Sequence, residues 1–113
     1  MFDIVTTVSY KLHMFTVYKT KYFIQWLDSL KDEIAQAHIV TRIARIETGL
    51  LGNVKFFHGI GELKINHGPG YRVYFIKQGQ EIILLLNGGD KSTQQKDIEK
   101  ALRIVKELKH GNH

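Results

Sequence analysis

The spacing of the apolar residues changes near the middle of this 113-residue chain, and the change limits the folds open to it. Before residue 50 the apolar side chains recur at helical spacing, whereas from Asn53 onward they alternate with polar ones. A period of about 3.6 residues indicates amphipathic helices, and a period of two indicates strands. The sequence therefore predicts an α+β domain in which two helices precede a sheet.

The first half of the chain predicts one short strand and two helices. Phe15 to Tyr18 alternates like a strand, and Thr20 after it can cap a helix. The apolar face expected for this first helix is Phe23, Trp26, Leu27 and Leu30. A second helix is expected from about Asp32 to Thr48, with Gly49 at its end and an apolar stripe of Ala35, Ile39, Ile43, Ile46 and Leu50. Residues 1–13 show no clear period, and we interpret them as an N-terminal extension outside the domain.

The second half predicts four strands joined by short turns. The candidate strands are Val54 to Phe57, Glu62 to Asn66, Tyr71 to Ile76 and Glu81 to Asn87. The turns between them are rich in glycine, and such short connections favour an antiparallel meander. The run from Ile82 to Leu86 is apolar throughout, which is typical of an interior strand covered on both faces.

A last helix follows the sheet. Gly88 to Lys91 is expected to break the strand, and Ser92 and Gln95 have the spacing of a capping box. The apolar face expected for this helix is Ile98, Ala101, Leu102, Val105 and Leu108, and residues 110–113 are expected to fray. The predicted order over residues 14–109 is β-α-α-β-β-β-β-α. It describes a small curved antiparallel sheet with two N-terminal helices and one C-terminal helix, all on one side.

The charge of the chain favours an acidic partner. Sixteen Lys and Arg residues face eleven Asp and Glu residues, so the formal net charge is +5 and the pI is about 9.5. A basic surface attracts nucleic acid, acidic membranes or acidic proteins. No cysteine is present, no stretch is apolar enough to span a membrane, and no signal peptide is evident, so we expect a cytoplasmic protein.

The strands on either side of Gly68-Pro69-Gly70 predict a cluster of polar side chains. If the apolar sets of both strands share the buried face, Ile65 lies opposite Val73 and Lys64 lies opposite Tyr74. Lys64, Arg72 and Tyr74 then project together from the open face of the sheet. Arginine can neutralise a transferring phosphoryl group, lysine can bind phosphate or act as a base, and tyrosine can stack on a nucleobase. The nuclease interpretation would fail if Arg72 were buried in the core, or if Lys64 and Arg72 projected from opposite sides of the sheet. Spacing alone favours a solvated sheet face with scattered charges over such a site.

Other polar residues give weaker indications. None of the six histidines forms a metal-spaced pair, so no metal site is expected. His67 is the exception of interest, because it is expected at the mouth of the hairpin, where neutral histidine could serve as a base. Lys91 could hold an anion at the start of the last helix, or simply solvate a turn.

Several segments together resemble a known family. They are Phe23 to Leu27, Leu50 to Lys55, Gly61 to Ile65, Gly68 to Phe75 and Leu85 to Gln94. In combination they are similar to the addiction module killer proteins of the RelE/ParE toxin superfamily, close to the HigB toxins and overlapping a phage-related Gp49-like family. The resemblance covers about residues 14–109.

The resemblance implies a ribonuclease that needs neither a metal nor a cofactor. RelE-type toxins enter the ribosomal A site, where the 2′-hydroxyl of the message attacks the adjacent phosphate and leaves a 2′,3′-cyclic end. Arg72 matches the arginine that stabilises the pentavalent phosphate, Lys64 a basic residue that acts as general base, and Lys91 a residue linked to protonation of the leaving group. Tyr74, His67, Glu62 and Lys55 are expected to support this site or bind RNA.

The chain departs from the family pattern at two places. Glu62 stands where some RelE toxins have lysine, and no Tyr or His lies between Lys91 and Leu108. Members of the ParE type lack the ribonuclease residues and inhibit DNA gyrase, so a gyrase-directed toxin without catalysis and a phage-derived host inhibitor remain alternatives. The resemblance also implies partners: a helix-turn-helix antitoxin encoded nearby, operator DNA bound through that complex, and the ribosome with its message.

Overall fold

The computed structural model describes residues 14–110, so the predictions for residues 1–13 and 111–113 lie outside the described part of the chain. The elements, in chain order, are β1 (Thr16–Lys19), α2 (Lys21–Ser29), α3 (Glu33–Glu47), β2 (Val54–Phe57), β3 (Ile60–Ile65), β4 (Tyr71–Gln78), β5 (Ile82–Asp90), the short 3₁₀ helix η1 (Lys91–Thr93) and α4 (Gln94–His110). The predicted order of strands and helices is confirmed. His110 belongs to α4, so the prediction that it begins a frayed tail is wrong.

Capping side chains fix the ends of the first two helices. Thr20 Oγ1 accepts a hydrogen bond from the Phe23 N–H at 3.1 Å, as predicted for a cap, and donates one to the Leu86 carbonyl. Asp32 caps α3 by accepting from the backbone of Ile34 and Ala35. At the other end Gly49 takes a positive φ of 96° and its N–H bonds the Ile46 carbonyl, as expected for a helix stop. Leu50 therefore lies beyond α3 and is 60 % exposed, so its place in the predicted apolar stripe is wrong.

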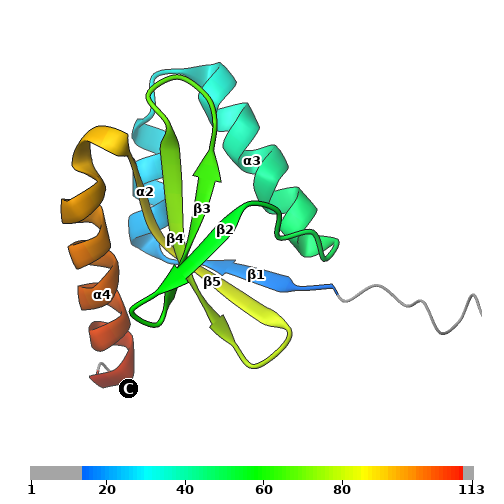
Figure 1. Ribbon diagram of the computed structural model, residues 1–113, viewed down its shortest axis with the longest axis vertical. Coiled ribbons are helices and arrows are strands. Elements are labelled where there is room, and N and C mark those ends of the chain that lie inside the picture. The colour runs from blue at the N-terminus through cyan, green and yellow to red at the C-terminus, as the bar shows by residue number, and fades with distance from the viewer. Residues whose placement is uncertain (1–13, 111–113) are drawn as a thin grey trace, which may run out of the picture.

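The sheet has the strand order β1-β5-β4-β3-β2 (Figure 1). Strands β2 to β5 form the predicted antiparallel meander, whereas β1 pairs with β5 in parallel, which corrects the expectation of a wholly antiparallel sheet. The two helices return the chain to the sheet at β2, which runs opposite to β1, and the three hairpin reversals that follow bring β5 beside β1 in the same direction. A bulge between Tyr74 and Phe75 offsets β4 from β5.

Helices cover both faces of the sheet, and the prediction that all three lie on one side is wrong. Figure 1 shows α4 and α3 on opposite sides of the sheet, and Tyr22 at the start of α2 reaches α4, where its hydroxyl donates to Glu107 Oε1 at 3.0 Å. The larger core joins α2 and α3 to the apolar face, and its centre includes Phe23, Ile39, Leu63, Val73 and Leu85. A smaller core of Ile60, Tyr74, Leu86, Ala101 and Ile104 lies under α4. Alternate residues of β5 enter the two cores, so this strand is interior and covered on both faces, as its apolar run predicted.

Two neighbouring glycines let the helices approach β5 closely. A Cβ at Gly88 would lie 2.4 Å from the Trp26 ring, and a Cβ at Gly89 would lie 1.8 Å from Asp97 Oδ2. Both glycines belong to β5, which continues to Asp90 instead of breaking at Gly88 as predicted. They keep the strand regular while α2 contacts it on one face and α4 on the other. None of the helices within residues 14–110 is both long and apolar enough to cross a membrane.

Candidate functional site

The β3–β4 hairpin brings the two predicted cations together. Lys64 pairs directly with Arg72, and Glu62 pairs with Tyr74. The register differs by two residues from the predicted one, because Tyr71 belongs to the apolar face and pairs with Ile65. A shift of two residues keeps every side chain on its face. The prediction that Lys64, Arg72 and Tyr74 share one face is therefore confirmed.

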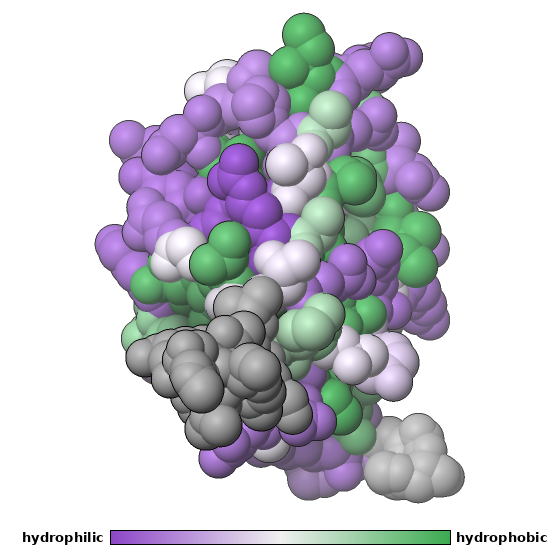
Figure 2. All heavy atoms as spheres, turned by 90° about the vertical axis from the view of Figure 1, so that its right-hand side faces the viewer, coloured by the Kyte–Doolittle hydropathy of each residue, from purple (hydrophilic) through white to green (hydrophobic). Residues whose placement is uncertain are grey.

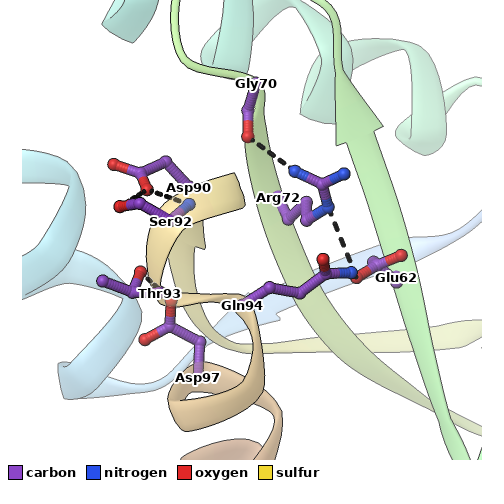
Figure 3. Close-up of polar contacts among 8 residues, drawn as sticks. All are labelled: Glu62, Gly70, Arg72, Asp90, Ser92, Thr93, Gln94 and Asp97. Atoms are coloured by element: carbon purple, nitrogen blue, oxygen red, sulfur yellow. Dashed lines mark hydrogen bonds and ion pairs between the residues drawn. The ribbon is translucent and has the colours of Figure 1, made fainter.

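That face is not open, because the start of α4 lies over it. Arg72 is only 7 % exposed, so the expectation of an accessible arginine is wrong. Its Nη1 donates to the Gly70 carbonyl at 2.9 Å, and its Nε lies 3.7 Å from Glu62 Oε2 (Figure 3). Nε itself is buried and has no hydrogen-bond partner among residues 14–110. The guanidinium is thus held at the floor of the site, outside both apolar clusters.

Glu62 connects this arginine to α4. Its carboxylate accepts a hydrogen bond from Gln94 Nε2 at 2.9 Å and is 4 % exposed. Lys55 pairs with Glu62 across β2 and β3 and is exposed. Glu62 therefore partly neutralises the charge of Arg72.

Tyr74 is completely buried under α4, which makes the predicted stacking on a nucleobase wrong for this conformation. Its hydroxyl has no hydrogen-bond partner of normal geometry among the described residues. Burial, followed by the neighbouring Glu62 carboxylate, raises the pKa of Tyr74 far above its usual range. The phenol therefore stays protonated and does not act as a base.

Lys91 reaches the same region from the other side of the hairpin loop. It opens η1, directly after Asp90, whose carboxylate caps this turn by accepting from the Ser92 N–H at 2.8 Å. The capping box predicted for Ser92 and Gln95 is wrong, since Ser92 donates to Asp90 and Gln95 to Glu99. A Cβ at Gly70 would lie 3.5 Å from Arg72 Nη1 and 3.9 Å from Lys91 Cβ. Gly70 thus lies beside both the guanidinium of Arg72 and the base of the Lys91 side chain.

His67 turns away from this cluster. Its Nε2 lies 3.3 Å from Asp32 Oδ2, and its ring stacks on that of His38 with 4.7 Å between centroids. His67 therefore ties the hairpin loop to α3, and the expectation that it serves as a base beside Arg72 is wrong for this conformation. The cap and the histidine together lower the pKa of Asp32, with the Ala35 N–H as the largest cause. No group of three or more His, Cys, Asp or Glu side chains within residues 14–110 is placed to hold a metal.

Sequence reasoning missed a row of polar residues beside Arg72. Asn87 pairs with Tyr74, is 1 % exposed, and donates from Nδ2 to the Asp97 carbonyl at 3.0 Å. Asp97 accepts from Thr93 Oγ1, and burial is the main cause that raises its pKa (Figure 3). An asparagine at the end of an apolar strand, followed by two glycines, was the available indication that a polar partner lies against it.

Comparison with known proteins identifies the family. Residues 25–109 match the family described as phage derived protein Gp49-like (DUF891), and the chain belongs to that family. An uncharacterized protein of Haemophilus influenzae (strain ATCC 51907 / DSM 11121 / KW20 / Rd) is 47 % identical over 87 residues, which are 76 % of this chain and 88 % of the relative.

A solved structure shows the same fold. One chain of the toxin–antitoxin complex RelBE2 from Mycobacterium tuberculosis superposes with a TM-score of 0.58 at 16 % identity, over 73 % of this chain and 97 % of that one. The three helices and curved five-stranded sheet are those of a RelE-like toxin fold, which confirms the predicted fold class.

Proposed function

We propose that this protein is the toxin of a toxin–antitoxin pair and that it cleaves messenger RNA on the ribosome. The observation that carries the proposal is that Lys64 lies directly opposite Arg72 across β3 and β4, and that Gly70 lies beside both Arg72 Nη1 and Lys91 Cβ. Arg72 from the hairpin and Lys91 from the following helical turn supply positive charge to a phosphate that gains negative charge during reaction, and Lys64 lies beside Arg72 as the candidate base. The chemistry needs no metal, because the nucleophile belongs to the RNA itself.

The proposed reaction is an internal transesterification. The 2′-hydroxyl oxygen of one nucleotide attacks the adjacent phosphorus, and the bond from phosphorus to the 5′-oxygen of the next nucleotide breaks. Lys64, in its neutral form, takes the proton of the 2′-hydroxyl, and Lys91 gives a proton to the leaving oxygen. Arg72 stabilises the negative charge of the pentavalent intermediate. The products are a 2′,3′-cyclic phosphate and a free 5′-hydroxyl.

The position of Arg72 sets a condition on this proposal. Because Glu62 and Gly70 hold the guanidinium and α4 lies over it, the phosphate must approach from the side of the hairpin loop, where Lys64 and Lys91 are exposed. Binding on the ribosome would then complete the contact between Arg72 and the phosphate, since catalytic contacts often tighten only in the substrate complex.

The test is a translation reaction with purified protein, in which message ends are mapped by primer extension. We expect cuts in messages that occupy ribosomes and none in free RNA. Arg72→Ala is expected to slow cleavage about a hundredfold, because one oxyanion contact contributes roughly 3 kcal/mol. Arg103→Ala, an exposed change on α4, is the matched control and should cleave normally. Intact message with unaffected translation would reject the nuclease.

A second candidate is a toxin that acts by binding alone, such as an inhibitor of DNA gyrase. The burial of Arg72 and Tyr74 favours it, because both side chains are sequestered in the free protein. Gyrase supercoiling assays separate the two candidates. Inhibited supercoiling with uncut message would support the binding toxin, whereas cut message with normal supercoiling would support the nuclease.

We further propose that the partners of this protein are a helix-turn-helix antitoxin encoded nearby, operator DNA bound through the toxin–antitoxin complex, and the ribosome with its message. The solved complex that shares the fold contains an antitoxin, which supports the first of these. Cytoplasmic location follows from the same proposal, because ribosomes are the expected target.

A further inference from the structure

A concave groove of about 510 Å³ lies between α3 and the end of β3. Its lining is His38, Thr41, Arg42, Arg45, Leu50, Gly52, Asn53, Lys64, Ile65 and Asn66. Figure 2 shows the side of the molecule that carries α3, where strongly hydrophilic side chains gather in the middle of the face with isolated apolar ones around them. The basic residues of this lining are Arg42, Arg45 and Lys64.

Arg42 is fixed in the wall of this groove. Its guanidinium donates to the carbonyls of Leu51 and Asn53, the latter at 3.2 Å. A Cβ at Gly52 would lie 2.7 Å from Arg42 Nη2, so the loop folds tightly over the arginine. Burial, and then the nearby Arg45, lower the pKa of Arg42. The positive charge of Arg45 therefore lies close to that of Arg42.

No acidic residue of the described chain lines the groove. The ion pairs found among residues 14–110 are His67–Asp32 and Arg72–Glu62, and neither involves Arg42, Arg45 or Lys64. Arg42 and Arg45 are two cations on one helix in a concave site without a carboxylate, and a walled groove concentrates the positive field that they create. Such an arrangement favours an anion with several charges.

Lys64 connects this groove to the candidate catalytic cluster. It lines the groove and also pairs directly with Arg72 across β3 and β4. We propose that the groove binds backbone phosphates of the same RNA strand, next to the phosphate that is cleaved. The inference rests on the proposed function for the identity of the strand, and Arg45 and Arg42 then serve as positioning residues.

The lining favours RNA over an acidic protein. Only Leu50 and Ile65 offer apolar side chains, whereas a protein interface depends on apolar and aromatic anchors in its centre. Thr41, Asn53 and Asn66 supply polar groups beside the cations. Hydroxyls, amides and arginines are the usual partners of phosphate oxygens.

The test measures the affinity of the full chain for a short single-stranded RNA with 2′-O-methyl riboses, which cannot be cleaved by the 2′-hydroxyl. Fluorescence anisotropy is recorded over a series of salt concentrations. Arg45→Gln removes an exposed cation that makes no side-chain bond found in the structure, and Thr41→Glu adds a carboxylate to the groove. Arg103→Gln on α4 is the matched control, and circular dichroism verifies the fold of each variant.

We expect Arg45→Gln to weaken binding about fivefold or more, and to reduce the slope of log affinity against log salt by about 0.7, the value for one phosphate contact on a single strand. Thr41→Glu should weaken binding at least as much, and Arg103→Gln should change neither quantity. RNA binding that Arg45→Gln and Thr41→Glu leave unchanged overturns the inference. So does an equal loss in Arg103→Gln, because the affinity would then reflect diffuse charge.

Two further outcomes separate this inference from its alternatives. A polyglutamate of matched charge that competes equally well with the RNA overturns it in favour of an acidic protein partner. Message left uncut on ribosomes, with the methylated RNA still bound through Arg45, rejects the proposed nuclease and supports the groove. Cut message with unchanged RNA affinity in Arg45→Gln supports the proposed nuclease and overturns the inference about the groove.

Discussion

The two faces of the sheet are covered by helices in different ways. On the face under α2 and α3 the strands contribute only apolar side chains to a continuous core. On the face under α4 the apolar core is smaller, and beside it Glu62, Arg72 and Asn87 are buried together. Buried polar groups normally find partners, yet Arg72 Nε, Tyr74 Oη and Asn87 Oδ1 find none in the described part of the chain. The comparison indicates that stability is concentrated on the first face and that the second has kept polar groups at the expense of stability.

The largest effect is expected from the apolar face. Phe23 is fully buried between α2 and the sheet, so Phe23→Ala should lower the free energy of unfolding by about 3–5 kcal/mol. Ile34→Ala, at a site that is 63 % exposed, is the control and should change it little. Urea denaturation measures both. A loss below about 1 kcal/mol for Phe23→Ala would show that the apolar face is not the main source of stability.

On the polar face the largest effect should come from Glu62. Glu62→Gln keeps the shape of the side chain but leaves Arg72 buried without a counter-charge, which we expect to cost roughly 3 kcal/mol. Glu99→Gln on the exposed side of α4 provides the matched control. Equal stability of Glu62→Gln and the wild type would mean that the weak 3.7 Å contact contributes nothing to holding the arginine.

The adjacent glycines test each face separately. Gly88→Ala would push against the Trp26 ring, and Gly89→Ala against the Asp97 carboxylate, and each should cost about 1–3 kcal/mol. Only Gly89→Ala should also speed hydrogen exchange in the first turns of α4, because Asp97 belongs to that helix. Faster exchange of α4 in Gly88→Ala would contradict the separation of the two faces.

A gain in stability is expected from Tyr74→Phe. The substitution removes a buried hydroxyl that has no hydrogen-bond partner of normal geometry within residues 14–110, so it should stabilise the protein by about 1 kcal/mol. Tyr18→Phe, at an edge-strand residue that is 55 % exposed, should have no effect. A loss of stability in Tyr74→Phe would show that the hydroxyl makes a favourable contact in solution.

The smallest effect is a dependence on pH with opposite sign for two carboxylates. Hydrogen bonds lower the pKa of Asp32, so its contribution is present above the unfolded-state value of about 3.9 and is lost as pH falls through the folded-state pKa. Burial raises the pKa of Asp97, so its charge opposes folding at neutral pH and this cost disappears as pH falls through its folded-state pKa.

Denaturation curves of Asp32→Asn and Asp97→Asn across the acidic range measure these contributions. Asp32→Asn should be less stable than the wild type at neutral pH and should approach it only in strong acid. Asp97→Asn should be at least as stable as the wild type at neutral pH, with the difference narrowing at mildly acidic pH. If the stability difference from the wild type did not change with pH for either variant, the assigned directions of the two pKa shifts would be contradicted.

The sequence predicted the order of the elements because helical spacing and alternation are local properties. It also placed Lys64, Arg72 and Tyr74 on one face, since the face depends only on the alternation of side chains along each strand. The exact pairing was missed because Tyr71 was not recognised as a core residue. Its ring packs edge-on against Trp26, a contact between distant elements that alternation does not reveal.

The covering of the site was also beyond local patterns. The amphipathic spacing of α4 predicts a helix with one buried face but does not say which face of the sheet it covers. The start of α4 lies over the site because this helix covers the face opposite α3. This placement brings Gln94 to Glu62, and Asp97 to Thr93 of η1. The same placement buries Arg72 and Tyr74, which the sequence alone had left in the open.

The central claim is that the polar face acts on RNA through Arg72. The most direct measurement is the rate of message cleavage on ribosomes, with chemical analysis of the 3′ end, for the wild type and for Arg72→Ala at conditions where both are folded. We predict a 2′,3′-cyclic phosphate and a rate about a hundredfold lower in the variant. Equal rates in both proteins, or an arrest of growth by Arg72→Ala without any cut in the message, would contradict the account.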